Sequence, residues 1–276
     1  RAKSQLDYIF SHHLQGVYYK IRDSEHKPSK AHLNRAGKKL EECLNLLPEL
    51  QSGKSFLDLC AGPGAWSYLL SERGYSGRGV TIAGDIKWHE KIKDLQNYKV
   101  VSPNDGDVMK RYVRDECKEG GKVDMVVADG GISSGEDDNH QELKVSKLKY
   151  AEFTLALSCL SVRGNLVLKL FDTFHEHTQN LIFSAAYLFR ECYIIKPATS
   201  RNVNSERYLV GLGYRDIPER CQSSADFLEG TLHSIFESWQ DEKTPGRVYE
   251  YQYLRPFCDS LYRSVREVER HQISSL

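Results

Sequence analysis

Short apolar runs alternate with helical patterns over most of this chain, and this alternation constrains the fold more than any other feature. Apolar runs bounded by turn residues predict strands at 54–60, 77–82, 98–102, 123–131, 164–171, 193–198 and 206–214. Apolar residues at helical spacing predict helices at 29–47, 65–73, 141–162 and 178–192, the first with Ser29 as its cap. Alternating strands and helices favour parallel βαβ units, and the near-continuous apolar strands are typical of a sheet covered on both faces.

The length of 276 residues suits one large α/β domain with an added segment. We expect an N-terminal arm at 1–28, a core at 29–214, and a C-terminal helical and β extension at 215–276 that packs on the core. The formal net charge is zero, which excludes a histone-like polycation and requires any nucleic-acid contact to use local basic patches. The seven cysteines show no zinc spacing, and no apolar run has the length of about 18 residues that a membrane helix needs.

A glycine-rich turn follows the first predicted strand in the stretch LDLCAGPGAWS, residues 57–67. Ligands of open α/β sheets bind outside the carboxyl ends of the strands, and Gly62 and Gly64 allow the backbone to approach a ligand closely. Asp58 stands just before the turn, where a carboxylate suits a cationic cofactor better than a pyrophosphate. S-adenosylmethionine carries both a sulfonium and an ammonium group and therefore fits this prediction. A tight packing turn with no ligand is the alternative.

Two further acids follow the third predicted strand, in the stretch NDGDV. Asp105 and Asp107 lie where they can reach the amino group of an adenine. The alternative for Asp107 is a helix cap.

One lysine interrupts the apolar run GNLVLKLFDTF, residues 164–174. Lys169 follows Leu166, Val167 and Leu168. One interpretation places its head in water at the end of the strand. The other makes it a catalytic group that points into a cleft.

Five stretches in this order carry a resemblance to a known family: LNRAGKKL, LDLCAGPGAWS, VVADGG, LVLKLFDTF and KPATSRNVNSERYLV. Together they resemble the FtsJ-like (RrmJ-like) ribose 2'-O-methyltransferases, most closely the eukaryotic and viral mRNA cap branch. The resemblance runs from about residue 33 to residue 214. It implies a Rossmann-like, seven-stranded methyltransferase sheet, mostly parallel with an antiparallel last strand and with helices on both faces.

The resemblance also implies a reaction, which is methyl transfer from S-adenosylmethionine to the 2'-hydroxyl of the first transcribed nucleotide of capped mRNA. It implies a catalytic tetrad of Lys39, Asp129, Lys169 and Glu206, with Lys38 as the alternative to Lys39. Taken singly, Lys39 is also typical of a solvated helix residue, Asp129 of a turn, and Glu206 of a surface ion pair. Burial and a second lysine lower the pKa of Lys169, whereas the two carboxylates raise it, so the sequence leaves the net direction open.

The cofactor residues implied by the resemblance are Asp58, Ala61, Gly62, Pro63, Gly64, Ala65, Trp66, Asp107 and Asp129. The turn CAGPGAW differs from the GCGRGGW-like form of the flaviviral enzymes and matches the cap-1 branch. The residues expected to contact RNA phosphates are Lys30, Arg35, Lys38, Ser200 and Arg201. Cap or base stacking is expected from Tyr18, Tyr19, Trp88 or the tyrosines 249, 251 and 253, although the last three also suit strand packing.

The expected partners are the capped 5' end of an mRNA and other capping or polymerase components, with no membrane. The expected location is cytoplasmic or nuclear, or the host cytoplasm or replication complex for a viral protein. Three alternatives stay open: the same chemistry on ribosomal or transfer RNA, a dual N7 and 2'-O cap enzyme, and a non-catalytic RNA-binding module of the same fold.

Overall fold

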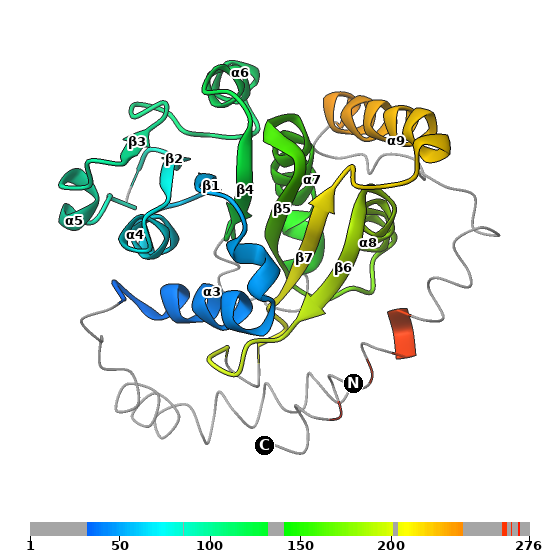
Figure 1. Cartoon of the computed structure of the whole chain (residues 1–276), viewed down its shortest axis with the longest axis horizontal. Helices are drawn as coiled ribbons and strands as arrows, with labels where there is room; N and C mark the ends of the chain where they lie inside the picture. The colour runs from blue at the N-terminus through cyan, green and yellow to red at the C-terminus, as the bar shows by residue number, and fades with distance from the viewer. Residues whose placement is uncertain are drawn as a thin grey trace.

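The fold is built on one seven-stranded sheet with the order β3-β2-β1-β4-β5-β7-β6 (Figure 1). The computed structural model describes residues 32–84, 86–131, 141–200, 204–239 and 261–263, together with residues 266 and 270. The strands are β1 (Ser55–Leu59), β2 (Ser76–Val80), β3 (Tyr98–Val100), β4 (Val123–Ala128), β5 (Leu160–Leu170), β6 (Phe189–Ile195) and β7 (Arg207–Tyr214). All neighbouring pairs from β3 to β5 are parallel, whereas β7 is antiparallel to both β5 and β6. The predicted fold class is therefore confirmed.

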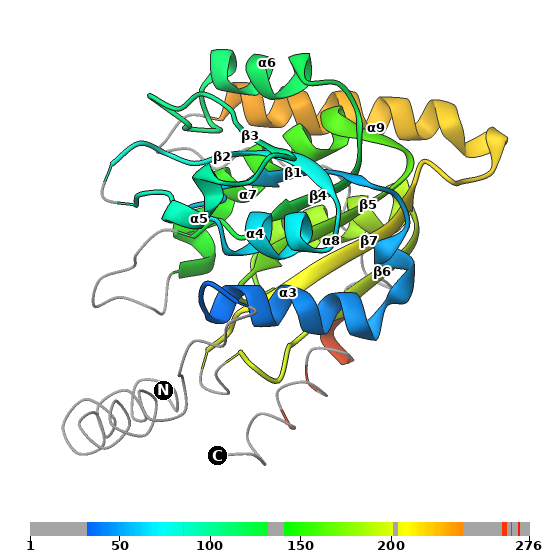
Figure 2. The same cartoon turned by 60° about the vertical axis from the view of Figure 1, so that its left-hand side comes forward.

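Helices cover both faces of the sheet (Figure 2). One face packs against α3 (Arg35–Leu46) and α4 (Ala65–Glu72). The other packs against α6 (Arg111–Glu119), α7 (Gln141–Cys159), α8 (Glu176–Leu188) and α9 (Glu219–Ser238). The short η2 (Pro48–Gln51) and α5 (Glu90–Lys93) lie in connections between these elements. We call the two faces the α3 face and the α7 face.

Alternate residues of each central strand reach opposite faces, because successive side chains of a strand point in opposite directions. In β5, Leu166 and Leu168 join the core of the α7 face, and Val167 joins that of the α3 face. Lys169 is the next residue after Val167 on the α3 side. The apolar run predicted from sequence is thus a strand buried on both faces, and its lysine lies on the side that α3 covers.

Three predicted boundaries were wrong. The first long helix begins at Arg35 with Asn34 as its cap, since the Asn34 side chain accepts a hydrogen bond from Ala36 N, so Ser29 is not the cap. The helix predicted to reach Val162 ends at Cys159, and the helix predicted to reach Cys192 ends at Leu188. In both cases a strand follows at once, because the apolar pattern continues from the helix into a strand without a turn residue.

The beginning of the C-terminal extension is the long helix α9, which packs on the α7 face. Arg114 of α6 lies over the ring of Phe236, 4.5 Å from its centroid, and Trp239 contacts the ring of Tyr150 edge-on. The rest of the extension, including the tyrosines at 249, 251 and 253, lies outside the described residues apart from a few positions near 261. Within the described part of the chain, no helix is long and apolar enough to cross a membrane.

Candidate active site

The candidate site begins where β4 and β5 end, because their register places Asp129 and Lys169 side by side. Ala128 pairs with Leu168 across the parallel strands, so the next residue on each strand is Asp129 or Lys169. The two side chains meet, with Lys169 Nζ 3.1 Å from Asp129 Oδ1. Lys169 Nζ also donates a hydrogen bond of 2.6 Å to the backbone oxygen of Asp129. The lysine is therefore fixed at the carboxyl edge of the sheet, away from free solvent.

The antiparallel strand β7 brings the glutamate to the same edge. Tyr208 pairs directly with Lys169, so their side chains share the α3 face. Glu206 precedes Tyr208 by two residues and lies on the same side of the chain. The antiparallel direction of β7 is what brings its first residues to the edge where the parallel strands end.

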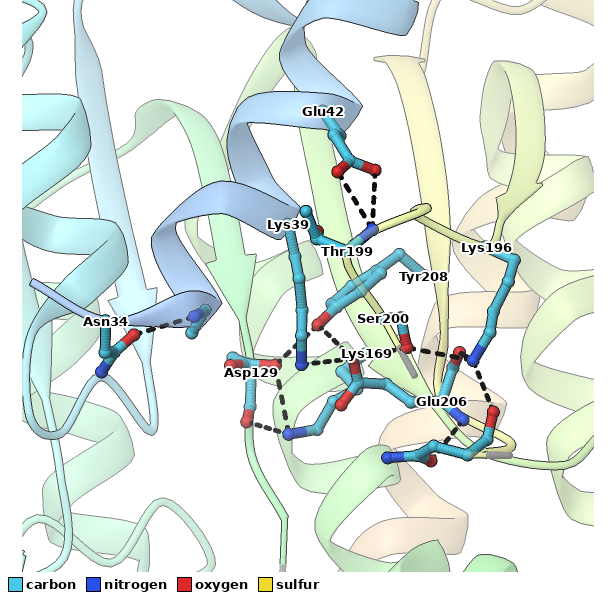
Figure 3. Close-up of polar contacts among 12 residues, drawn as sticks. Asn34, Lys39, Glu42, Asp129, Lys169, Lys196, Thr199, Ser200, Glu206 and Tyr208 are labelled. Atoms are coloured by element: carbon cyan, nitrogen blue, oxygen red, sulfur yellow. Dashed lines mark hydrogen bonds and ion pairs between the residues drawn. The ribbon is translucent and has the colours of Figure 1, made fainter. Parts of the chain in front are cut away.

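Helix α3 contributes the second lysine from above this edge (Figure 3). Lys39 lies on the buried side of α3 together with Leu40 and Cys43. Its Nζ is 2.5 Å from Glu206 Oε1, and the two side chains are only 11% and 7% exposed. The structure thus brings together all four residues of the predicted tetrad, Lys39, Asp129, Lys169 and Glu206.

Tyr208 joins the two lysine–carboxylate pairs into one network. Its hydroxyl lies 3.2 Å from Asp129 Oδ1 and 3.1 Å from Glu206 Oε1, and it can donate to one of them at a time. Tyr208 is fully buried and packs against the ring of Trp66, with centroids 5.6 Å apart. No sequence pattern singled out this tyrosine.

The charge of Lys169 follows from its neighbours. Burial by itself lowers the pKa of Lys169, but Asp129 and then Glu206 outweigh burial, so the pKa is raised above its usual value. Burial raises the pKa of Glu206, but Lys39 and Lys169 outweigh it, and that pKa is lowered. Lys169 is therefore an ammonium at neutral pH, and Glu206 is a carboxylate. This decides the question that the sequence left open.

A half-buried lysine that no sequence pattern singled out, Lys196, lies beside the tetrad. Lys196 Nζ donates to Ser200 Oγ at 3.0 Å, to the backbone oxygen of Glu206 at 2.8 Å, and to that of Asn204. Burial lowers the pKa of Lys196 to about 8, although Glu206 opposes this shift. Lys196 directly follows β6 in YIIKPA, and a lysine beside an apolar run is the same signal that drew attention to Lys169.

The connection from β6 to β7 is also attached to α3. The carboxylate of Glu42 accepts a hydrogen bond from Thr199 N, with Oε1 at 3.1 Å. Ser200 is buried, and its hydroxyl donates to Glu206 Oε1 at 3.3 Å. Ser200, predicted to contact RNA phosphate, is thus engaged inside the site.

The glycine-rich turn lies at the same edge of the sheet. Asp58 is fully buried, and its Oδ2 accepts a hydrogen bond of 2.6 Å from Ser67 Oγ. Its Oδ1 has no hydrogen-bond partner among the described residues. Burial raises the pKa of Asp58 to about 8, against the lowering effect of Ser67, and the nearby Asp129 raises it further. A buried carboxylate oxygen without a partner fits a ligand that brings positive charge or hydrogen-bond donors.

The backbone of the turn also suits a ligand. Gly64 precedes α4 with φ +106°, a conformation that favours glycine, and no side chain caps the helix. Ala61, Gly62, Pro63 and Ala65 form the backbone of this turn, and Ala61 N is held by the oxygen of Val80 at 2.9 Å. Trp66 is buried, and its indole N–H donates to the oxygen of Ala36 at 2.7 Å. The indole therefore ties α4 to α3.

The acids after β3 lie beside the end of β2, since a Cβ placed on Gly106 would be 1.9 Å from the backbone oxygen of Thr81. Asp107 Oδ1 accepts a hydrogen bond from Met109 N at 3.0 Å. The N-cap of α6 is Lys110, so Asp107 does not cap that helix. Asp105 binds Lys110 and Tyr112.

The other predicted RNA-contacting residues are placed as follows. Arg35 and Lys38 lie on α3 and are half-buried. Trp88 is half-buried and packs edge-on against Tyr98. Lys30, Arg201, Tyr18 and Tyr19 lie outside the described residues.

This fold, with two lysines and two carboxylates gathered beside a glycine-rich turn, is that of a Rossmann-like methyltransferase. Comparison with known proteins gives the family. The model of the FtsJ-like methyltransferases matches residues 33–214. The chain belongs to this family.

Several curated proteins are similar to the chain. One named cap-specific mRNA (nucleoside-2'-O-)-methyltransferase 1, from Trypanosoma cruzi, is 31% identical over 79% of this chain and 67% of its own length. One of the same name from Leishmania braziliensis is 33% identical over 68% of this chain and 54% of its own length. A cap-specific mRNA (nucleoside-2'-O-)-methyltransferase of Autographa californica nuclear polyhedrosis virus is 33% identical over 64% of this chain and 70% of its own length. The chain thus spans about half the length of the Leishmania relative.

Proposed function

We propose that the chain is a cap-specific mRNA methyltransferase that acts on the ribose 2'-hydroxyl of the first transcribed nucleotide. The observation that carries this proposal is the network of Lys39, Asp129, Lys169 and Glu206 at one edge of the sheet. The curated relatives from two trypanosomatids and a virus are named as cap-specific mRNA (nucleoside-2'-O-)-methyltransferases. These names support the choice of substrate.

The reaction forms a bond between the 2'-oxygen and a methyl carbon, breaks the bond from that carbon to sulfur, and releases the hydroxyl proton to solvent. S-adenosylmethionine, when bound, supplies an activated methyl group. Asp58 and the backbone of residues 61–66 are the groups that would hold it, with Asp107 toward the adenine. Since the donor is activated, the contribution left to the protein is to hold the hydroxyl in line and to stabilise its developing negative charge.

Lys169 has the charge for that task. Its raised pKa keeps it an ammonium, and an ammonium that is already oriented stabilises a developing alkoxide without reorganisation. Asp129 holds this ammonium on one side, and Glu206 holds Lys39 on the other. In this proposal the carboxylates orient the lysines, and the lysines contact the reacting oxygen.

The proposed partner is the capped 5' end of an mRNA, with Arg35 and Lys38 on α3 and the residues 30 and 201 as phosphate contacts. Other capping or polymerase components are proposed as protein partners. The matching location is where capped mRNA is made or processed, in the nucleus or cytoplasm of a cell or in a viral replication complex.

The test is methyl transfer from labelled S-adenosylmethionine to three RNAs of one sequence, with an N7-methylated cap, an unmethylated cap or no cap. We expect transfer to the N7-methylated capped RNA and none to the uncapped RNA. Equal transfer to uncapped RNA would favour a ribosomal or transfer RNA enzyme. Label on the cap guanine would show a dual N7 enzyme, and binding of RNA without any transfer would show a binding module.

A further inference from the structure

A buried ion pair on α7 lies beneath the turn that carries Asp129. Lys149 and Glu152 are three residues apart on the helix, so their side chains leave the same face. Lys149 Nζ is 2.6 Å from Glu152 Oε2, and the side chains are 4% and 0% exposed. Moving two charges out of water is costly, and a buried pair is therefore weak evidence of added stability. The contacts that the Lys149–Glu152 pair makes, rather than added stability, must therefore explain why it is buried at this position.

Both members of the pair bind the backbone of one glycine. Gly130 N donates to Glu152 Oε1 at 3.0 Å, and Lys149 Nζ donates to the oxygen of Gly130 at 2.7 Å. The pair thus fixes two consecutive peptide units directly after Asp129. A Cβ placed on Gly130 would be 2.1 Å from Glu152 Oε1, so any side chain at this position would displace the Glu152 carboxylate.

The pair also reaches the glycine-rich turn. Burial and then the charge of Glu152 raise the pKa of the thiol of Cys60, the residue after β1. The same Cβ on Gly130 would be 3.1 Å from Cys60 Sγ, so the two turns are in contact. Glu152 therefore binds the turn that carries Asp129 at the place where this turn meets the turn proposed to hold the cofactor.

We propose that Lys149 and Glu152 are a positioning pair for methyl transfer, which holds the Asp129–Gly131 turn so that Asp129 orients Lys169. This inference rests on the proposed function. Lys169 Nζ binds both Asp129 Oδ1 and the oxygen of Asp129, so a shift of this turn moves the lysine. Neither Lys149 nor Glu152 contacts the reacting atoms in this proposal.

Two double substitutions test whether the pair acts by holding the Asp129–Gly131 turn in position. K149M/E152Q and K149M/E152L both remove the two charges, but only glutamine keeps an acceptor for Gly130 N. The concentration of competent sites is measured by calorimetric titration with S-adenosylhomocysteine, and kcat is then expressed per competent site. We expect kcat of K149M/E152L to fall about tenfold or more below that of K149M/E152Q, since a small misplacement of a catalytic group has effects of this size. The KM for capped RNA stays the same in both.

The matched control is an exposed pair with the same spacing. Lys118 Nζ is 2.6 Å from Asp115 Oδ1 on α6, and D115L/K118M should keep the wild-type kcat. Equal kcat values per competent site in both α7 variants and the wild type would overturn the inference. If K149M/E152L does not fold, the kcat of K149M/E152Q tests the inference by itself. The loss of the Lys149 donor should lower this kcat below the wild-type value. An unchanged kcat would overturn the inference. An inactive wild type would instead count against the proposed function.

Discussion

Lys169 is held by two contacts with one residue, the side chain and the backbone oxygen of Asp129. A second lysine, Lys39, is held by the side chain of Glu206. Each cation thus has its own carboxylate, and Tyr208 lies between the two pairs. At the scale of single residues, the site is a charge-balanced network in which each ammonium group keeps a fixed position.

Replacement of Lys169 by arginine tests whether shape matters as well as charge. The Lys169→Arg variant keeps the positive charge, but its planar and larger head cannot occupy the place of a compact ammonium. We expect kcat for methyl transfer to fall about 100-fold or more, as for other losses of a positioned catalytic group. The control is Lys118→Arg on the exposed surface of α6, which should have the wild-type rate. A Lys169→Arg enzyme with near-normal kcat would refute the role given to Lys169.

The buried carboxyl of Asp58 makes stability depend on pH. Its pKa is raised to about 8 in the folded protein, so between pH 4 and pH 8 the folded state binds more protons than the unfolded state. Stability from this group is therefore lost as pH rises through that window, by up to about 1.4 kcal/mol per pH unit. Asp58→Asn should flatten this decline in urea denaturation at pH 5, 6, 7 and 8. Asp115→Asn, at an exposed site, is the control, and identical slopes for Asp58→Asn and the wild type would contradict the prediction.

The tetrad residues could be named from sequence, whereas the residues that support them could not. Lys39, Asp129, Lys169 and Glu206 were found because motifs in a fixed order resemble a known family. Lys149, Glu152 and Lys196 belong to segments that read as an ordinary helix or the end of a strand. Lys149 and Glu152 are buried, and all three residues contact backbone atoms outside their own segment. These properties depend on packing and cannot be read from one segment.

At the scale of elements, α3 and the connection from β6 to β7 form one support for the tetrad. Lys39 and Glu42 leave α3 one turn apart, and they bind Glu206 and Thr199 respectively. Lys196 closes the connection from the other side by binding Ser200 and the backbone of residues 204 and 206. The position of Glu206 therefore depends on three separate attachments.

Removal of the Lys196 ammonium should loosen this connection. In Lys196→Met the three donated hydrogen bonds are lost, so we expect kcat to fall about tenfold through displacement of Glu206. Because the pKa of Lys196 is about 8, the wild-type kcat should also decline as pH rises through 8, and the methionine variant should lack this decline. Lys122→Met, which removes a lysine bonded to the oxygen of Ser158 at an exposed site, should behave as the wild type. A wild-type kcat and pH profile in Lys196→Met would disprove the assignment.

The elements themselves were largely predictable, and two of the three boundary errors share one cause. All seven strands were predicted near their observed positions, because most of them contain a short apolar run. The ends of α7 and α8 were misplaced because no glycine or proline separates either helix from the strand that follows. The helical and strand patterns overlap there, and only the pairing of Leu160 and Phe189 with neighbouring strands decides the boundary.

At the scale of the whole molecule, α9 packs against α6 and α7 on the face opposite to α3. Phe236 is buried beneath Arg114, whereas Phe227 of the same helix is 78% exposed. We propose that α9 is a structural part of the core, which stabilises the α7 face without contributing to catalysis.

A pair of substitutions on α9 tests this assignment. Phe236→Ala removes a buried aromatic side chain and should lower the free energy of unfolding by about 3 kcal/mol, whereas the exposed Phe227→Ala should change it by less than about 0.5 kcal/mol. Urea denaturation measures both, and kcat per folded molecule should be unchanged in each. A Phe236→Ala protein with wild-type stability would show that α9 is not part of the core.

The proposed reaction places a methyl group on the 2'-oxygen of the first transcribed nucleotide. Two N7-methylated capped RNAs that differ in one atom test it most directly, one with a 2'-hydroxyl and one with a 2'-deoxyribose at that nucleotide. Transfer of label from S-adenosylmethionine should occur with the first RNA and be absent with the second, and Lys169→Arg should abolish the difference by removing the activity. Equal transfer to the two RNAs would contradict the account, because the methyl group would then be placed on another atom.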